Sequence, residues 1–160
     1  FKRIPSVNYP EWTGENFRDD SEQMILARAI FGEARDSRLS DNVRMAVGWT
    51  IRNRIEDQRN RWGKTFHDVI LQAKQYSAFN EFDPNRPFVE NPLHSQSVID
   101  KKAWQNCYKI AGQVISGEVA DPTRGANHYY SVFGDNHPSY FWATKETFVI
   151  KIDNTYFHRL

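Results

Sequence analysis

The sequence predicts an α+β fold in which helices come first and a small antiparallel sheet closes the chain. Apolar residues recur at helical spacing in several segments before residue 117. The C-terminal part carries two runs rich in β-branched and aromatic residues on either side of Asp153-Asn154, which is typical of a two-residue hairpin. Helices followed by strands indicate the α+β class.

The composition limits the size and the class of the protein. A chain of 160 residues is long enough for one domain with its own core. A net charge of +1 does not favour a nucleic-acid or membrane-surface protein. No apolar run approaches the roughly 18 residues that span a bilayer, so we expect no integral membrane segment. The single Cys107 excludes an intramolecular disulfide framework.

Aromatic residues make up 14% of the chain, which is a high share for so polar a sequence. The rings either fill a small core or are displayed along a binding groove, and composition alone leaves both interpretations open.

The N-terminal segment differs from the rest of the chain. Residues 1–19 contain Pro5, Pro10 and Gly14 and are expected to form an irregular N-terminal arm. Residues 20–160 then form a single domain. Because the chain begins with Phe1 and not with Met, we expect a processed form or a fragment, with a signal peptide or a further domain outside it.

Four helices are predicted from apolar periodicity and from capping residues. The first is expected to begin at Asp20 or Ser21, because Asp20 followed by Gln23 imitates a capping box. The last is expected to end at Gly117. The predicted helices cover residues 20–34, 42–55, 66–73 and 97–116.

The last predicted helix and the segment before it are unusual. The helix over 97–116 is apolar over a wide arc, so we expect it to be the buried central helix, with Cys107 as a small core residue. Three X-Pro pairs in residues 76–96 predict a long loop lying on the helices, and loops of that length are often functional.

Extended structure is expected only near the C-terminus. The turn at 121–125 precedes an extended segment at 127–133, and the hairpin arms follow at 147–152 and 155–160.

Glu33 is the first candidate for chemistry. It lies four residues after Ala29 and three after Ile30, so it continues an apolar stripe of the first helix. It also lies in the last turn, where the helix dipole disfavours a carboxylate. Both placements raise the pKa of a carboxyl group, which suits a general acid near neutral pH. From geometry alone, an exposed Glu33 paired with Arg28 or Arg35 is favoured over this interpretation, which stays open.

Asn53 is a second candidate because its amide is unhelpful inside a helix. It could brace a neighbouring loop or a catalytic side chain, or it could face solvent beside Arg52 and Arg54.

Two short segments carry groups that suit a sugar. Gln75, Tyr76 and Ser77 place an amide, a ring and a hydroxyl just past a helix end. In the extended segment, His128 and Tyr130 share one face while Tyr129 points to the other, so that one face lines the core and the other a cleft.

Other chemistries have no sequence pattern here. The five histidines lack metal-ligand spacing, and neither a G-x-S-x-G elbow nor a Gly-rich phosphate loop occurs. We therefore expect neither a metal nor another cofactor.

Five blocks of sequence, in order, resemble the SleB-type (spore-cortex-lytic) family of cell wall hydrolases. Together they cover about residues 24–160. Three features depart from the family pattern, namely Arg124 where a second Gly is usual, a longer insertion around 78–96, and the N-terminal arm. The blocks are residues 27–35 (ARAIFGEAR), residues 46–54 ending in Asn-Arg, Gln75-Tyr76-Ser77, residues 121–130 (DPTRGANHYY), and the tail from Pro138.

The resemblance implies a mostly helical, lysozyme-like domain over residues 20–160 that cleaves the MurNAc–GlcNAc β-1,4 bond of peptidoglycan. It places the family's catalytic glutamate at Glu33. The residues expected to hold the sugar are Gln75, Tyr76, Ser77, His128 and Tyr130, with Asn53 as a supporting residue.

The resemblance favours a single-carboxylate mechanism, because the nearest other carboxylates, Asp36 and Asp41, are expected to cap the next helix. Glu33 would then act as both acid and base of a lytic transglycosylase that forms a 1,6-anhydro ring. A lysozyme-type muramidase, a non-catalytic peptidoglycan-binding or structural domain, and a different wall enzyme such as an amidase are the alternatives.

The expected partner is the glycan strand of peptidoglycan, with no nucleic acid, and the expected state is a monomer. We expect action at the cell envelope, after secretion, or on a host wall after delivery by a phage. The aromatic residues are then expected to be divided between the core and the groove, with Trp104 and Tyr108 in the core. The groove rings are expected to be Tyr76, Tyr129 or Tyr130, Phe79 and Phe82.

Overall fold

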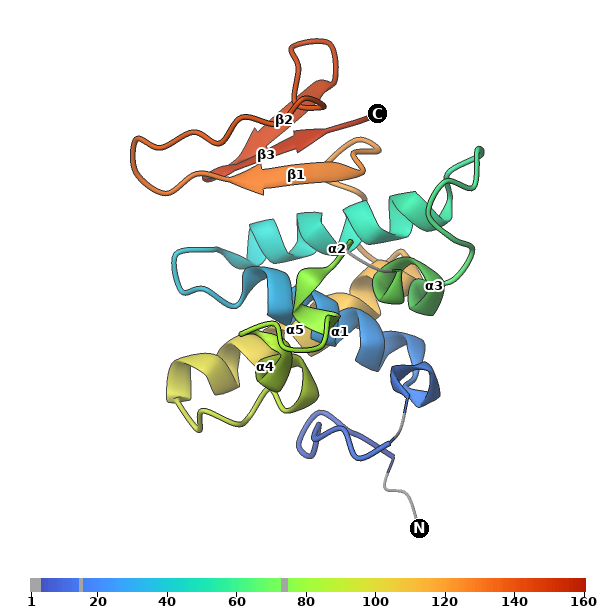
Figure 1. Cartoon of the computed structure of the whole chain (residues 1–160), viewed down its shortest axis with the longest axis vertical. Helices are drawn as coiled ribbons and strands as arrows, with labels where there is room; N and C mark the ends of the chain where they lie inside the picture. Colours follow the sequence, from blue (N-terminus) through green and yellow to red (C-terminus); the bar gives the residue numbers. More distant parts are fainter. Residues whose placement is uncertain (1–3, 15, 73–74) are drawn as a thin grey trace.

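The computed structural model describes residues 4–14, 16–72 and 75–160 and has the expected α+β architecture, with the strands in a layer of their own beside α2 (Figure 1). The elements in chain order are η1 (Phe17–Asp19), α1 (Glu22–Ala34), α2 (Asp41–Ile55), α3 (Phe66–Leu71), η2 (Ser77–Phe79), α4 (Arg86–Glu90), α5 (Val98–Ser116), β1 (His128–Ser131), β2 (Phe148–Ile152) and β3 (Thr155–His158).

Hydroxyl groups cap the start of each longer helix, as the sequence indicated. Ser21, and not Asp20, caps α1, because its hydroxyl accepts a hydrogen bond from the amide of Met24. Gly117 ends α5 in the left-handed conformation at φ 72°. Predicted helix residue Ala73 lies outside the described residues. The caps of α2, α3 and α5 are Ser40, Thr65 and Ser97.

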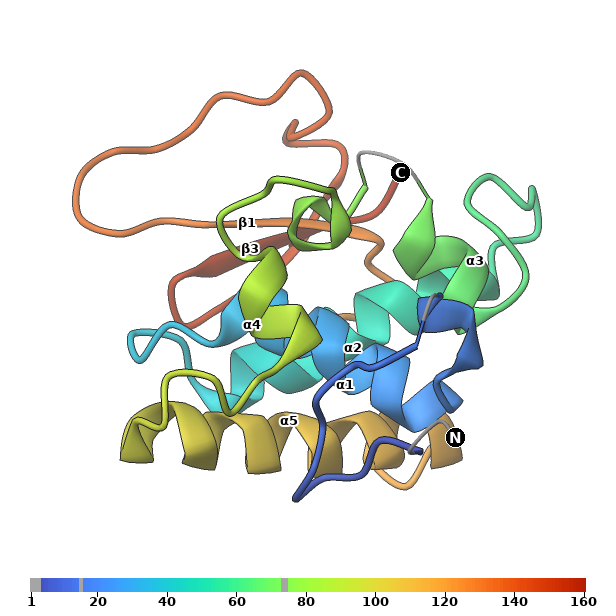
Figure 2. The same ribbon diagram turned by 60° about the horizontal axis from the view of Figure 1, so that its bottom comes forward.

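The central helix is α1, so the expectation that the last helix would be central is wrong. Every side chain from Met24 to Phe31 is buried, and α1 packs against α2, α3, α4 and α5. In contrast, α5 lies along one edge of the molecule (Figure 2), buries one stripe that includes Trp104 and Cys107, and leaves Val98 and Ile99 exposed. An apolar stripe on one side suits a covering helix, whereas burial all round requires apolar residues on every side.

One charged residue is buried with the apolar side chains of α1. Arg28 is fully buried and is therefore not the surface partner of an exposed Glu33. Its Nε donates to Asp20 at 2.8 Å, and its Nη2 donates to the carbonyl of Pro10 at 2.6 Å. Its Nη1 donates to the carbonyls of Val89 and Glu90. Arg28 therefore joins α1 to the N-terminal arm and to the end of α4.

The arm itself has no regular element in residues 4–14, yet it packs on the helices. The indole of Trp104 donates to the carbonyl of Val7 at 2.8 Å, and the amide of Trp12 donates to the carbonyl of Glu90 at 2.7 Å. The ring of Trp12 stacks on Phe17.

The segment 76–96 is not a simple loop, because it contains η2 and α4. Pro87 is compatible with α4 because it occupies the first turn, where no amide hydrogen is needed. The segment approaches α1 closely at Gly32, where a Cβ would lie 2.8 Å from Val89 and 3.0 Å from Ala78. Glycine at position 32 therefore lets this segment lie beside Glu33.

The three strands form an antiparallel sheet in the order β1-β3-β2, and the hairpin turn at Asp153-Asn154 confirms the prediction. Phe157 of β3 is buried with Ala46 of α2 and Ala126. The sheet thus covers α2 and leaves β1 as an edge strand.

We predict that Arg28→Met lowers the free energy of unfolding by about 3–5 kcal/mol, because it strands the Asp20 carboxylate and several carbonyls without a donor. Urea denaturation measures the change. Asp20→Leu with Arg28→Met should remain destabilised, since the carbonyls of Pro10 and Val89 still lack their donor. Arg59→Met, on an exposed residue, is the matched control. An Arg28→Met variant that is as stable as Arg59→Met would contradict the prediction.

Candidate active site

Glu33 lies in the last turn of α1 at the wall of a hollow of about 530 Å³. The tyrosine hydroxyl of Tyr129 donates to its Oε1 at 2.7 Å. Elements far apart in the sequence supply the lining, which comprises Glu33, Arg54, Gln75, Tyr76, Ser77, His128, Tyr129, Tyr140 and Trp142.

The Glu33 carboxyl is surrounded by protein atoms, although the residue keeps part of its surface open to the hollow. Burial raises its pKa, while the Tyr129 hydrogen bond and the positive charge of Arg54 oppose that rise. The open alternative, an exposed Glu33 paired with Arg28 or Arg35, is not what the structure has. Arg35 instead lies 3.7 Å from Asp100 and over the ring of Phe88.

Of the two tyrosines that the sequence left open as groove rings, Tyr129 is the one that lines the hollow. Tyr129 lines the hollow and contacts Glu33, whereas Tyr130 is not among the lining residues and stacks on Tyr156 across the sheet, with ring centroids 5.1 Å apart. Because β1 is the edge strand, His128 and Tyr129 can both border the hollow from its first residues. Tyr130 adjoins the hollow through its ring contacts with Tyr140 and Trp142, at centroid distances of 5.8 and 6.2 Å, and its contact with the sugar stays a prediction.

Gln75, Tyr76 and Ser77 all line the hollow, as expected from their position after a helix end. The Tyr76 residue is only 3% exposed, and its hydroxyl has no hydrogen-bond partner among the described residues. Burial raises the pKa of Tyr76 to about 12, so the hydroxyl keeps its proton. The Tyr76 hydroxyl is thus a buried polar group beside the hollow that lacks a partner among the described residues.

Arg54 connects the three segments of the site, and the sequence analysis did not assign it a role. It is buried near the end of α2, and its guanidinium donates to the carbonyl of Asn127 at 2.8 Å and to the side-chain oxygen of Gln75 at 3.0 Å. It also lies over the rings of Trp62 and Tyr76. Its position in the Asn-Arg block was the signal that could have identified it.

Asn53 points away from Glu33 and holds the loop before β1. Its amide donates to Asp121 at 2.8 Å and to the carbonyl of Ala126 at 2.9 Å. Asn53 therefore braces a loop and does not simply face solvent, which decides between the two open interpretations. In that loop, Arg124 adopts a left-handed φ of 56°, which explains why glycine suits the position.

The aromatic rings of the hollow come partly from residues that the sequence analysis missed. Tyr140 and Trp142 belong to the long connection between β1 and β2, which extends away from the sheet (Figure 2), and their rings stack with centroids 5.0 Å apart. Of the rings expected in the groove, Phe79 is buried in the core and Phe82 is exposed on the surface outside the hollow.

A second hollow of about 500 Å³ also borders Glu33. Its lining includes Glu33, Asn85 and Asp36. Asp36 was expected to cap α2, but Ser40 is the cap and Asp36 binds Arg38. This contact lowers the pKa of Asp36 to about 2. Glu33 therefore borders two polar hollows.

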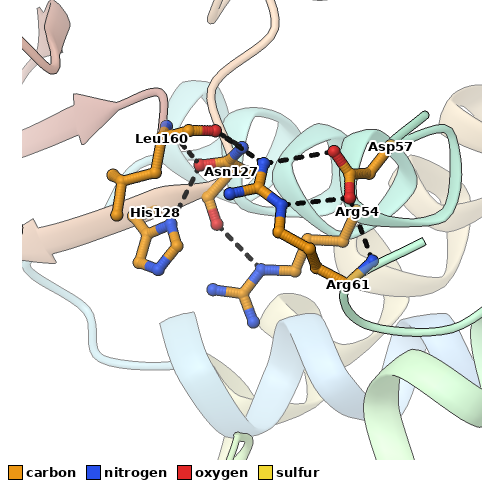
Figure 3. A network of polar contacts seen from close by, with 6 residues as sticks. All are labelled: Arg54, Asp57, Arg61, Asn127, His128 and Leu160. Atoms are coloured by element: carbon orange, nitrogen blue, oxygen red, sulfur yellow. Dashed lines mark hydrogen bonds and ion pairs between the residues drawn. The ribbon is translucent and has the colours of Figure 1, made fainter. Parts of the chain in front are cut away.

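The polar network beside the first hollow fixes the start of β1 (Figure 3). The Asn127 carbonyl accepts from Arg54, and its side chain forms two hydrogen bonds with the backbone of Leu160. Arg61 donates to the carbonyl of Leu160 at 2.6 Å and pairs with Asp57. These contacts hold His128 and Tyr129 in place at the hollow.

A buried carboxyl group of raised pKa beside two polar hollows defines a site suited to general acid–base chemistry. The family model of the cell wall hydrolases matches residues 40–158, and the chain belongs to this family. This confirms the resemblance seen in the sequence motifs and points to an enzyme that degrades peptidoglycan at the cell envelope. The matched range begins after Glu33, so the role of Glu33 rests on its geometry and on the first sequence block.

Comparisons with curated proteins and with solved structures found no match. None of the helices in the described parts of the chain is long and apolar enough to cross a membrane.

We predict that Tyr129→Phe raises the pKa of Glu33 further, because the lost hydrogen bond favours the ionised carboxylate. A pH titration of the side-chain carboxyl carbon by NMR measures the pKa directly. Tyr130→Phe, which alters the next ring of the same strand, should leave it unchanged. A pKa of Glu33 that stays constant or falls in Tyr129→Phe would show that the hydrogen bond does not act in this way.

Proposed function

We propose that the protein is a lytic transglycosylase that cleaves the MurNAc–GlcNAc β-1,4 bond of peptidoglycan, with Glu33 as its single acid and base. The observation that carries the proposal is the buried carboxyl group of Glu33, whose raised pKa favours a proton ready for donation. Family membership supplies the substrate class.

Among the described residues that line the hollow between α1 and β1, Glu33 is the only carboxylate. This supports a mechanism in which one group donates a proton and later accepts one. The second hollow does contain Asp36 and Asp100, but Asp36 binds Arg38 and Asp100 accepts from Ser95. Both of these carboxylates are thus engaged within the protein.

The two hollows that share Glu33 in their linings suit a polymeric substrate. A glycan strand that is cut internally must occupy space on both sides of the broken bond, and Glu33 borders both spaces. In the hollow that Tyr129 borders, the rings of Tyr140 and Trp142 can lie against a sugar face, while the exposed Gln75 and Ser77 offer polar groups to its hydroxyl and acetamido substituents and Tyr76 lines the wall.

In the proposed reaction, Glu33 donates its proton to the glycosidic oxygen, and the bond to the muramic C1 breaks. The acetamido group of the substrate stabilises the positive charge at C1. Ionised Glu33 then takes the proton of the muramic C6 hydroxyl, and the C6 oxygen bonds to C1 and closes the 1,6-anhydro ring. The proton returns to Glu33, so no water is consumed.

A muramidase that uses water in place of the C6 hydroxyl remains the second candidate. The low pKa of Asp36 keeps it ionised near Glu33 in the same hollow, which is the property that a second carboxylate needs.

We predict that Glu33→Gln lowers lysis of purified peptidoglycan by about 10²–10⁴-fold, because the amide cannot transfer the proton. Stability should be equal or higher at neutral pH. Burial raises the pKa of Glu33, so its ionisation costs folding free energy as the pH rises through that pKa. Turbidity loss of sacculi and a thermal unfolding curve give the two measurements. Substantial lysis by a folded Glu33→Gln variant would remove the assignment of Glu33.

We predict that digestion of purified sacculi releases muropeptides lighter by one water than the reducing-end products, because the anhydro ring forms without water. Mass spectrometry separates the two products. Only reducing-end MurNAc would support the muramidase, and binding without soluble fragments would support a non-catalytic domain.

A further inference from the structure

The environment of His128 allows only one arrangement of its proton. Leu160 fixes the orientation of the neighbouring Asn127 amide, because the Leu160 amide donates to Oδ1 of Asn127 at 3.0 Å and Nδ2 of Asn127 donates to the Leu160 carbonyl at 3.2 Å. Oδ1 can only accept hydrogen bonds. His128 Nδ1 lies 2.9 Å from that oxygen and must therefore carry the proton (Figure 3).

The other ring nitrogen, Nε2, then presents a lone pair. No hydrogen bond within the described parts of the chain engages it, and His128 lines the hollow that contains Glu33. The rings of Trp62 and Trp142 lie against the imidazole, with centroids 5.7 and 4.9 Å away, and hold its orientation.

The charged groups around His128 keep the ring neutral. Burial and the positive charges of Arg54 and Arg61 lower the pKa of His128 to about 4, with a further contribution from His158 on β3. Asp57 is bound to Arg61, and Glu33, on the facing α1, is the carboxyl group that shares the hollow. Nε2 is thus an acceptor at neutral pH.

We propose that His128 is a substrate-binding residue whose Nε2 accepts a hydrogen bond from a hydroxyl or amide N–H group of the glycan strand beside Glu33. Asn127 is the positioning residue that imposes this tautomer. The identity of the ligand rests on the proposed function, whereas the tautomer rests on the geometry alone. An acceptor at this point selects a sugar face with a donor and repels a carboxylate or carbonyl oxygen.

The first test concerns the tautomer and requires no activity. A long-range ¹H–¹⁵N NMR spectrum of the ¹⁵N-labelled protein at neutral pH should show Nδ1 protonated and Nε2 bare for His128. A proton on Nε2, whether in the other tautomer or in the imidazolium form, would overturn the proposal.

The second test uses steady-state kinetics on a soluble GlcNAc–MurNAc oligosaccharide. His128→Phe keeps a ring but removes the acceptor, so KM should rise about tenfold with kcat little changed. His128→Gln should recover part of the loss, because its amide oxygen can accept a hydrogen bond. His137→Phe, at an exposed histidine outside both hollows, is the matched control.

The outcomes separate the two proposals. A KM for His128→Phe equal to that of the control, or an equal loss in the Phe and Gln variants, would overturn the role of Nε2. If His128→Phe does not fold, the comparison of His128→Gln with the native enzyme decides, and a KM raised beyond a few-fold in that variant would count against an acceptor role. Failure of the proposed function would appear as an inactive native protein, while the NMR result would still decide the tautomer.

Discussion

The buried ion pair between Arg28 and Asp20 is the contact on which the arrangement of the helices depends. A guanidinium inside an apolar core is costly unless its donors find partners, and Arg28 forms four hydrogen bonds, to Asp20 and to the carbonyls of Pro10, Val89 and Glu90. Burial lowers the pKa of Arg28 and raises that of Asp20. The charge and the hydrogen bond of each partner oppose the shift in the pKa of the other. This one side chain ties the N-terminal arm and α4 to α1, the helix that ends at the active site.

The candidate active site at the end of α1 depends on a second buried arginine, Arg54 of α2. Arg54 joins the end of α2 to the start of β1 and to Gln75, so the segments that line the hollow are linked through one guanidinium. Its charge also opposes the rise in the pKa of Glu33 and lowers that of His128. Arg54 therefore links the segments around the hollow, and its charge acts beside burial on the pKa values of Glu33 and His128.

Local sequence signals predicted most of the secondary structure and the pKa direction of Glu33. Hydroxyl caps and the hairpin turn act over a few residues, and the dipole and stripe position of Glu33 belong to its own helix. The prediction failed where long-range packing decides. Arg28 was named as a partner of an exposed Glu33, because nothing in its own helix shows that the N-terminal arm and α4 pack over it. Tyr129 and Tyr130 both stayed open as groove rings, because alternation along a strand gives two faces but does not tell which borders the hollow.

The sequence by itself determined the α+β class, the helix starts, the hairpin, the family resemblance and Glu33 as the candidate acid. Each depends on residues close together in the chain or on their order. Only the tertiary structure decided that α1 is central, that Tyr129 holds Glu33, that Tyr140 and Trp142 line the hollow, and that Asn127 sets the tautomer of His128. The physical reason is that the partner of a buried polar group is whichever distant segment folds over it, and no local period or spacing encodes that segment.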